Sequence, residues 1–153
     1  MIFISHRGNI AGPNPKDENK IEYINNAIEL GFNVEIDVWF YKNNFYLGHD
    51  NPEYKINKNF LLNKKLWCHA KNFDSLVNLK KIKAHFFWHQ EDDFVLTSKG
   101  FIWTYPGKKL NNKSICVLPE KTKKFDHSKD YAGICSDFIH KYKKKIRSLS
   151  KKT

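Results

Sequence analysis

Residues 33–40 read NVEIDVWF, and this stretch decides the fold that the sequence predicts. Apolar Val34 and Ile36 alternate with Glu35 and Asp37, which is the period-two pattern of a strand. Both acids therefore project from one face. Two adjacent carboxylates repel each other unless a proton or a cation neutralises them, and Mg²⁺ or Ca²⁺ takes such oxygen ligands. The alternative is that one acid faces solvent at the end of the strand.

The neighbouring segments predict an α/β fold. A strand over residues 2–5 precedes a helix whose apolar residues recur near a 3.6-residue period, and Gly31 suits the end of that helix. A strand, a helix and a strand in this order imply a right-handed crossover and a parallel sheet. Further strands are expected at 45–47, after a turn at Asn43 and Asn44, and at 66–70, 85–89, 94–97, 101–104, 114–118 and 133–136, with helices from an N-cap at Asp74 to about residue 82 and from near Phe138.

Composition indicates one globular domain. Of 153 residues, 41% are hydrophobic and 15% aromatic, so we expect a single domain over residues 1–143 and a basic tail, or the end of the last helix, over 144–153. Three cysteines without close spacing argue against a disulfide framework or a CxxC metal site. No apolar run approaches the roughly 20 residues that span a bilayer, and the first run is too short for a signal peptide. A cytoplasmic location is therefore expected.

The formal net charge of +11 favours anionic partners: phosphate esters, nucleic acid or an acidic membrane surface. Much of this charge lies at 121–124 and from Lys141 through Lys152. A solvated or frayed tail accounts for the second cluster without any partner. Nucleic acid is the less favoured of the partners, and a small phosphodiester or a lipid headgroup is the favoured one.

Polar residues follow the first strand directly, as His6, Arg7 and Gly8. An arginine side chain binds two phosphate oxygens at once, and glycine lets a ligand approach the backbone. His49, in the excursion after the second strand, could face His6 across a metal ion. Histidine can act as general base in one step and general acid in another, which is worth roughly 10²–10⁴ in rate.

His69 and Lys71 repeat the i, i+2 spacing at the end of the strand over 66–70. Ligands of α/β folds bind at the carboxyl ends of parallel strands, so both residues are candidates for the same site. The alternative is that His69 is an ordinary histidine of the core.

Taken in order, these motifs resemble those of the glycerophosphodiester phosphodiesterase family, a branch of the phosphatidylinositol-phosphodiesterase-like TIM barrels. The matching segments are HRG at 6–8, NPKDEN at 14–19, VEIDV at 34–38, LGHD at 47–50, FIWT at 101–104 and GICSDF at 133–138. The match is dense over the first 50 residues and weaker beyond them.

This resemblance implies an enzyme, a metal-dependent phosphoric diester hydrolase of lipid metabolism that acts on a glycerophosphodiester-like substrate. It also implies a fold, a reduced TIM-like (β/α) barrel without several peripheral helices, because a full barrel takes about 250 residues. The implied roles are catalysis for His6 and His49, phosphate binding for Arg7 and Lys71, metal ligation for Glu35 and Asp37 with Glu18 near the metal, and a place in the substrate pocket for Trp103.

Two departures from the family pattern matter. The third main strand of the family usually carries Glu-x-Lys, where this chain has His69-Ala70-Lys71. His69 could bind instead and shift the preference toward Mn²⁺ or Zn²⁺, or Glu18 or a later acid such as Glu120 could complete the site. The chain is also short for a barrel, and an uncovered aromatic stretch such as 86–88 would favour a homodimer.

Two other functions stay open. A phospholipase of the sphingomyelinase D type, to which the polar-x-Lys at 69–71 and Trp103 are also similar, would form a cyclic phosphate as it releases a lipid headgroup. A non-catalytic module with a decayed site would bind an anionic polymer through the basic tail and exposed aromatic residues. The histidine at position 69, in place of an acid, is the best support for that module.

Overall fold

The structure is a computed structural model that describes residues 1–122, 125 and 130–149. Its elements are β1 (Ile2–His6), α1 (Ile21–Glu29), β2 (Asn33–Tyr41), β3 (Asn44–Leu47), β4 (Tyr54–Ile56), the short 3₁₀-helix η1 (Phe60–Leu62), β5 (Leu66–Ala70), α2 (Phe73–Lys81), β6 (Phe86–Trp88), β7 (Phe94–Leu96), β8 (Ile102–Thr104), β9 (Ser114–Val117), the 3₁₀-helix η2 (Pro119–Lys121), β10 (Gly133–Ser136) and α3 (Ile139–Leu149). The parallel pairing predicted across α1 is confirmed, since β1 and β2 are parallel neighbours. Strand β4 was not among the strands predicted from the sequence.

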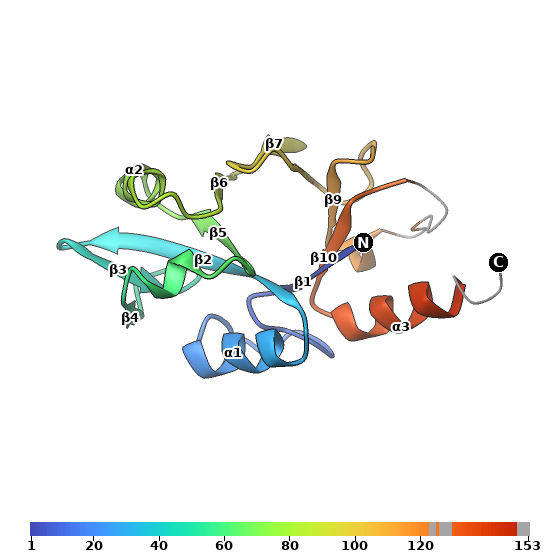
Figure 1. Cartoon of the computed structure of the whole chain (residues 1–153), viewed down its shortest axis with the longest axis horizontal. Helices are drawn as coiled ribbons and strands as arrows, with labels where there is room; N and C mark the ends of the chain where they lie inside the picture. Colours follow the sequence, from blue (N-terminus) through green and yellow to red (C-terminus); the bar gives the residue numbers. More distant parts are fainter. Residues whose placement is uncertain (123–124, 126–129, 150–153) are drawn as a thin grey trace.

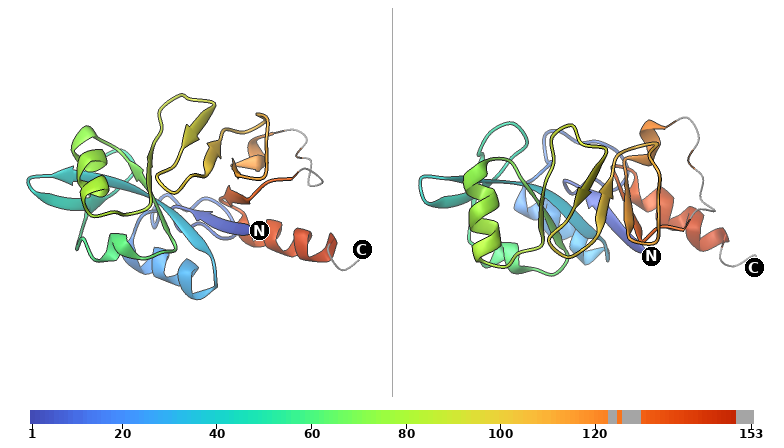
Figure 2. Two further views of the ribbon diagram at one scale, coloured as in Figure 1. Left: turned by 45° about the horizontal axis from the view of Figure 1, so that its top comes forward. Right: turned by 90° about the horizontal axis from the view of Figure 1, so that it is seen from above.

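The strands form one curled, mixed sheet (Figure 1). Parallel pairing joins β6, β5, β2, β1, β10, β9 and β8 in that order. Antiparallel pairing adds β3 to β2, β4 to β3 and β7 to β8. Figure 2 shows the curl from two further sides. The sheet thus has an outer face and a concave face.

The expected TIM-like (β/α) barrel is wrong. Only three short α-helices, of 9, 9 and 11 residues, occur in the described part of the chain, and the sheet is mixed and curls only partway round. The connections explain the difference. Residues 105–113 join β8 to β9, which is shorter than the dozen or more residues that a helical crossover needs. Strand β8 instead returns along β7 as an antiparallel hairpin.

Helix α2 begins at a different residue from the one predicted. The N-cap is Asn72 and not Asp74: the Asn72 side chain accepts a hydrogen bond from the Ser75 backbone N–H at 2.9 Å, and Ser75 reciprocates. The same side chain donates from Nδ2 to the carbonyl oxygen of Phe40 at 2.9 Å. An asparagine can do both because it carries an acceptor and a donor, whereas an aspartate carries acceptors alone. Asn72 therefore ties the start of α2 to β2.

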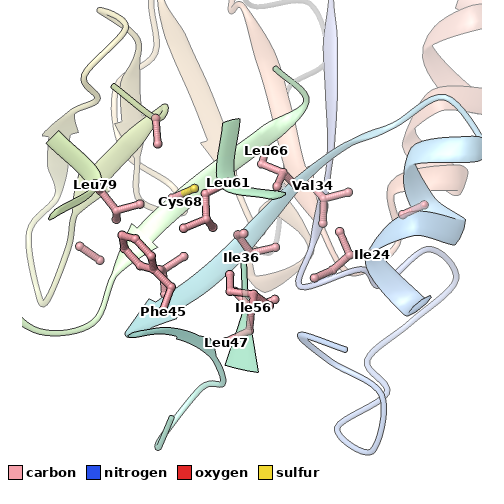
Figure 3. Packing of buried hydrophobic residues seen from close by; sticks show 14 residues of the cluster. Ile24, Val34, Ile36, Phe45, Leu47, Ile56, Leu61, Leu66, Cys68 and Leu79 are labelled. Atoms are coloured by element: carbon pink, nitrogen blue, oxygen red, sulfur yellow. The ribbon is translucent and has the colours of Figure 1, made fainter. Parts of the chain in front are cut away.

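Alternation along the strands separates the two faces of the sheet. On the outer face, Val34, Ile36 and Val38 of β2 pack with residues from both neighbouring helices, such as Ile24 of α1 and Leu79 of α2 (Figure 3). On the concave face a second cluster is built mainly from aromatic and branched residues, namely Ile4, Trp67, Phe87, Trp103, Ile115, Val117, Leu118 and Cys135. The two acids of β2, Glu35 and Asp37, lie on this concave face.

Within the aromatic stretch over 86–88, Phe87 is buried and its two neighbours are partly buried. Phe87 belongs to the concave cluster, while Phe86 and Trp88 pack against the outer one. The homodimer based on this stretch stays a prediction. Cys68, Cys116 and Cys135 are buried and unbridged, as expected of small core residues.

The basic clusters are described in part. Lys121 lies in η2, and α3 carries the second cluster as far as Leu149. Positions 123–124 and 150–152, which the charge prediction also included, lie outside the described residues. Among the described residues, no helix has the length and apolar character needed to cross a membrane.

Candidate metal centre

The register of the sheet brings the predicted residues together. His6, at the end of β1, lies beside Glu35 of β2, and Asp37 lies beside His69 of β5. The outer-face partners of the same strands are apolar, so the polar side chains gather on the concave face.

Glu35, Asp37 and His69 form a group that could hold a metal ion. One ligand atom from each lies within 4.8 Å of the other two. His69 Nδ1 is 3.2 Å from Asp37 Oδ1 and 3.7 Å from Glu35 Oε1. Within the described residues, no donor meets Glu35 Oε2 or Asp37 Oδ1 in hydrogen-bond geometry, although both oxygens are buried. The Lys71 ammonium, 3.4 Å from Asp37 Oδ1, offsets part of this buried negative charge, and a bound cation would satisfy both oxygens.

The two acids of this group have opposite electrostatic surroundings. Burial, and then the charge of Asp37, raise the pKa of Glu35. Burial alone would also raise the pKa of Asp37, but polar contacts from His49 and His69 and the charge of Arg7 hold it well below its ordinary value. Asp37 is therefore the more stable carboxylate of the pair. The ionised form of Glu35 is the one that a nearby cation would stabilise most.

His69 is oriented for ligation. Its Nε2–H donates to the carbonyl oxygen of His89 at 3.0 Å, and its ring stacks on Phe87 with centroids 5.2 Å apart. Nδ1 is then the nitrogen that faces the two acids. A metal-binding histidine commonly has its other ring nitrogen held by a carbonyl in this way.

The side chain of Arg7 contacts two acids, Asp37 and Glu18. Its Nε lies 2.8 Å from Asp37 Oδ2, and its NH1 donates to Glu18 Oε2 at 3.3 Å. The backbone at Arg7 has φ +55°, a left-handed conformation that is strained by roughly 1–2 kcal/mol in a residue with a side chain. Its N–H donates to the carbonyl oxygen of Glu35 at 2.9 Å, which holds this sharp bend. The bend returns the guanidinium over β2.

His6 is paired with an acid from the far end of the chain. Its Nδ1–H donates to Asp137 Oδ1 at 2.7 Å, while its Nε2 lies 3.8 Å from Glu35 Oε2. Burial disfavours a charge on His6, but the bond to Asp137 and the charge of Glu35 outweigh burial and raise the pKa of His6. Asp137 thus sets both the ring orientation and the protonation of His6.

His49 reaches the same site from the loop after β3. Its Nδ1 is 3.5 Å from Asp37 Oδ2 and its Nε2 is 3.5 Å from NH2 of Arg7, while 46% of its side chain is exposed. The loop is held at Gly48, whose carbonyl oxygen accepts a hydrogen bond from Trp39 Nε1 at 2.7 Å.

A cavity of about 780 Å³ opens over these side chains, within the size range of small-molecule sites. Asp37 lies beneath it, and Lys71 reaches over Asp37 with its Nζ 3.4 Å from Oδ1. Trp103 lines the cavity. The wall combines cationic, acidic and aromatic groups, among them His6, Arg7, Lys71, Trp88, Tyr105 and Lys121.

No protein-family model, curated protein or solved structure matches the chain.

Two acids considered as extra ligands are engaged elsewhere. Glu18 lines the cavity, but its carboxylate accepts from Arg7 at 3.3 Å and from Asn9 at 2.8 Å. The carboxylate of Glu120 accepts from the Ser136 hydroxyl at 2.9 Å and from the Asp137 backbone N–H at 3.0 Å. Neither belongs to the three-residue group.

Three supporting residues were missed from the sequence. Asn19 bonds Asp37 twice, through its side-chain donor and through its acceptor, both at 2.9 Å. Asn9 is fully buried and donates to Glu18 and to Asp137. Asn19 and Asp137 had a usable signal, because they lie in the segments NPKDEN and GICSDF, whereas Asn9 lies in a loop whose path the sequence does not reveal.

Proposed function

We propose that this protein is a metal-dependent phosphodiester hydrolase acting on a glycerophosphodiester-like substrate. The observation that carries the proposal is the buried Glu35, Asp37 and His69 group, beneath a cavity that His6 and His49 both line. The motifs that resemble the glycerophosphodiester phosphodiesterase family supply the reaction type.

The cationic side chains of the cavity, Arg7 and Lys71, bind the phosphate. Arg7 and Lys71 already stand against Asp37, with nitrogens 2.8 and 3.4 Å from its oxygens, so a phosphate entering the cavity meets positioned donors. Such donors stabilise the charge that grows on the phosphate oxygens during transfer. A metal ion, when bound, would supply Lewis-acid polarisation of the phosphate.

His6 and His49 transfer the protons. His6, held through Nδ1 by Asp137, keeps Nε2 on the cavity side and donates a proton to the leaving oxygen. His49, more exposed and close to Asp37, accepts the proton of the attacking hydroxyl or water. Two histidines on one phosphodiester are suited to exchange these roles between steps.

Cleavage of bis-(p-nitrophenyl) phosphate and of glycerophosphocholine with added divalent metal tests the proposal. We expect His6→Ala and His49→Ala each to lower kcat by about 10²–10⁴-fold. His140→Ala is the matched control, because His140 is an exposed histidine outside the cavity and should keep full activity. Full activity in either cavity variant would overturn the assignment.

The choice of substrates and ligands also distinguishes the two alternative functions. Release of choline from a lysophospholipid with a cyclic phosphate product, and no turnover of glycerophosphocholine, would favour the sphingomyelinase D type. Salt-sensitive nucleic-acid binding without metal uptake or turnover would favour the non-catalytic module.

A further inference from the structure

Helix α3 carries a dense cationic face. It contains Lys141, Lys143, Lys144, Lys145 and Arg147 and no acidic residue. Among the described residues, none of these cations has a carboxylate within 4 Å. Lys143 is partly tied down, with its Nζ 4.3 Å from the Phe32 ring and 3.5 Å from the carbonyl oxygen of Leu30. The other four are exposed.

Beside this face lies an apolar groove of about 310 Å³, between α3 and the end of α1. Both helices lie below the sheet in Figure 1. The floor consists of Ile10, Leu30 and Phe32, and the rim is formed by four residues of α3, namely His140, Lys143, Lys144 and Arg147. Among the residues that the structure describes, the groove and the cavity of the candidate metal centre share no lining residue. We call the rim, the floor and the remaining cations of α3 the basic surface.

We propose that the basic surface docks the protein on an anionic phospholipid bilayer. Five cations without acidic partners complement a layer of anionic headgroups, and a polybasic helix of this size is typical of such recognition. Leu30, with 53% of its surface exposed, and Leu149, with 47%, are available to contact the apolar part of the interface.

Two details favour a bilayer over a nucleic acid. Surfaces that bind single-stranded nucleic acids commonly add aromatic rings on which bases stack. The aromatic residue of the groove, Phe32, is only 2% exposed, so it cannot serve in that way, and the accessible apolar contacts are aliphatic.

The packing of α3 also predicts how it binds. Ile139, Tyr142 and Ile146 form the apolar stripe of the helix and pack against the protein body. The helix therefore lies on the bilayer without inserting that stripe, and most of its attraction is electrostatic. Salt should weaken such binding strongly, because the screening length falls from about 10 Å at 0.1 M to about 3 Å at 1 M.

Co-sedimentation of the full chain with phosphatidylcholine vesicles, with and without about 30% phosphatidylserine, tests the proposal. We expect binding to the anionic vesicles only. Lys144→Glu combined with Arg147→Glu should weaken it by well over about 25-fold, since each lost cation alone contributes about fivefold and each introduced carboxylate adds repulsion. Lys58→Glu combined with Lys64→Glu changes the net charge equally at exposed sites elsewhere and should have little effect.

A second pair of variants tests the apolar contact that Leu30 makes with the bilayer. Leu30→Ser should weaken binding several-fold, whereas Leu62→Ser, at a leucine that is 48% exposed elsewhere, should not. Equal losses in the two charge doubles, binding to neutral vesicles, or tighter binding to an RNA duplex than to anionic vesicles would each overturn the proposal. Circular dichroism of every variant separates lost binding from lost folding.

Discussion

At the scale of single residues, Asp137 shows how a side chain far along the chain controls a candidate catalytic group. It accepts the Nδ1–H of His6 at 2.7 Å and is itself held by Asn9 at 2.9 Å. Burial opposes the charge of Asp137, but the bond and charge of His6 keep its pKa below the ordinary value. Asp137 is therefore an anionic acceptor that fixes the orientation of the His6 ring.

We predict that Asp137→Asn lowers kcat on the phosphodiester substrates by about 10²-fold while Km changes little. The amide keeps the size of the side chain but removes its charge. In a His6→Ala background the same change should have almost no further effect, because Asp137 acts through His6. Kinetics of the two single variants and of the double variant measure this coupling, and additive losses would contradict the positioning role.

His85 should make the stability of the fold depend on pH. Burial, and then the charge of Lys99, lower the pKa of His85 to about 4. Because the unfolded chain takes up this proton near 6.5, the contribution of neutral His85 is complete above that pH and is lost as the pH falls toward 4. We expect a loss of about 2 kcal/mol after allowing for partial solvent screening.

The variant His85→Gln isolates this effect. Glutamine keeps a polar group near Thr97, whose hydroxyl lies 3.0 Å from Nε2 of His85, but it does not titrate. Urea titrations at a series of pH values should give a flatter stability curve for His85→Gln than for the wild type between pH 6.5 and about 4. Parallel curves would show that His85 is not the responsible group.

At the scale of elements, the loop after β3 positions His49 through one glycine. Gly48 has φ +150°, and a Cβ at this position would overlap the carbonyl oxygen of Asn51. Gly48→Ala should therefore destabilise the protein by about 1–3 kcal/mol and displace His49, with a drop in kcat. Thermal unfolding and steady-state kinetics measure the two effects.

Gly100 supplies the control for that prediction. It has φ +80° in the β7–β8 turn, but an added Cβ would meet nothing within 4 Å. Gly100→Ala should cost only the conformational strain of its backbone, about 1 kcal/mol, and leave kcat unchanged. Equal effects of the two alanines on kcat would contradict the steric explanation.

At the scale of the whole molecule, the candidate metal centre joins β2 and β5, which are parallel neighbours in the sheet. Glu35 and Asp37 belong to β2, which pairs with β1, β3 and β5, and His69 belongs to β5. A bound cation would also relieve the repulsion between the two buried acids. Metal binding should therefore stabilise the entire fold.

We expect Mn²⁺ at 100 times its Kd to add about 2.7 kcal/mol and raise Tm by about 5–10 °C relative to protein in EDTA. Glu35→Gln should abolish this rise, and Glu29→Gln, at an exposed acid of α1, should keep it. His69→Glu should shift the preference from Mn²⁺ or Zn²⁺ toward Mg²⁺ or Ca²⁺. Calorimetric scans with each metal measure these shifts, and an unchanged rise in Glu35→Gln would place the metal elsewhere.

The sequence by itself determined the local features. Alternation in NVEIDVWF defined β2 and paired Glu35 with Asp37, the 3.6-residue period defined α1, and the turn at Asn43 defined the β2–β3 hairpin. Each of these signals lies within a few residues, where backbone periodicity alone decides which side chains share a face.

Only the tertiary structure decided the rest. Whether the strands close into a helix-covered barrel depends on connections and pairings between distant segments, and the short 105–113 connection and the β7 hairpin produced a mixed, curled sheet instead. The partnership of His6 with Asp137 joins residues 131 positions apart, and Asn19 reaches Asp37 from a loop. Such contacts follow from register and chain path, which local patterns do not encode.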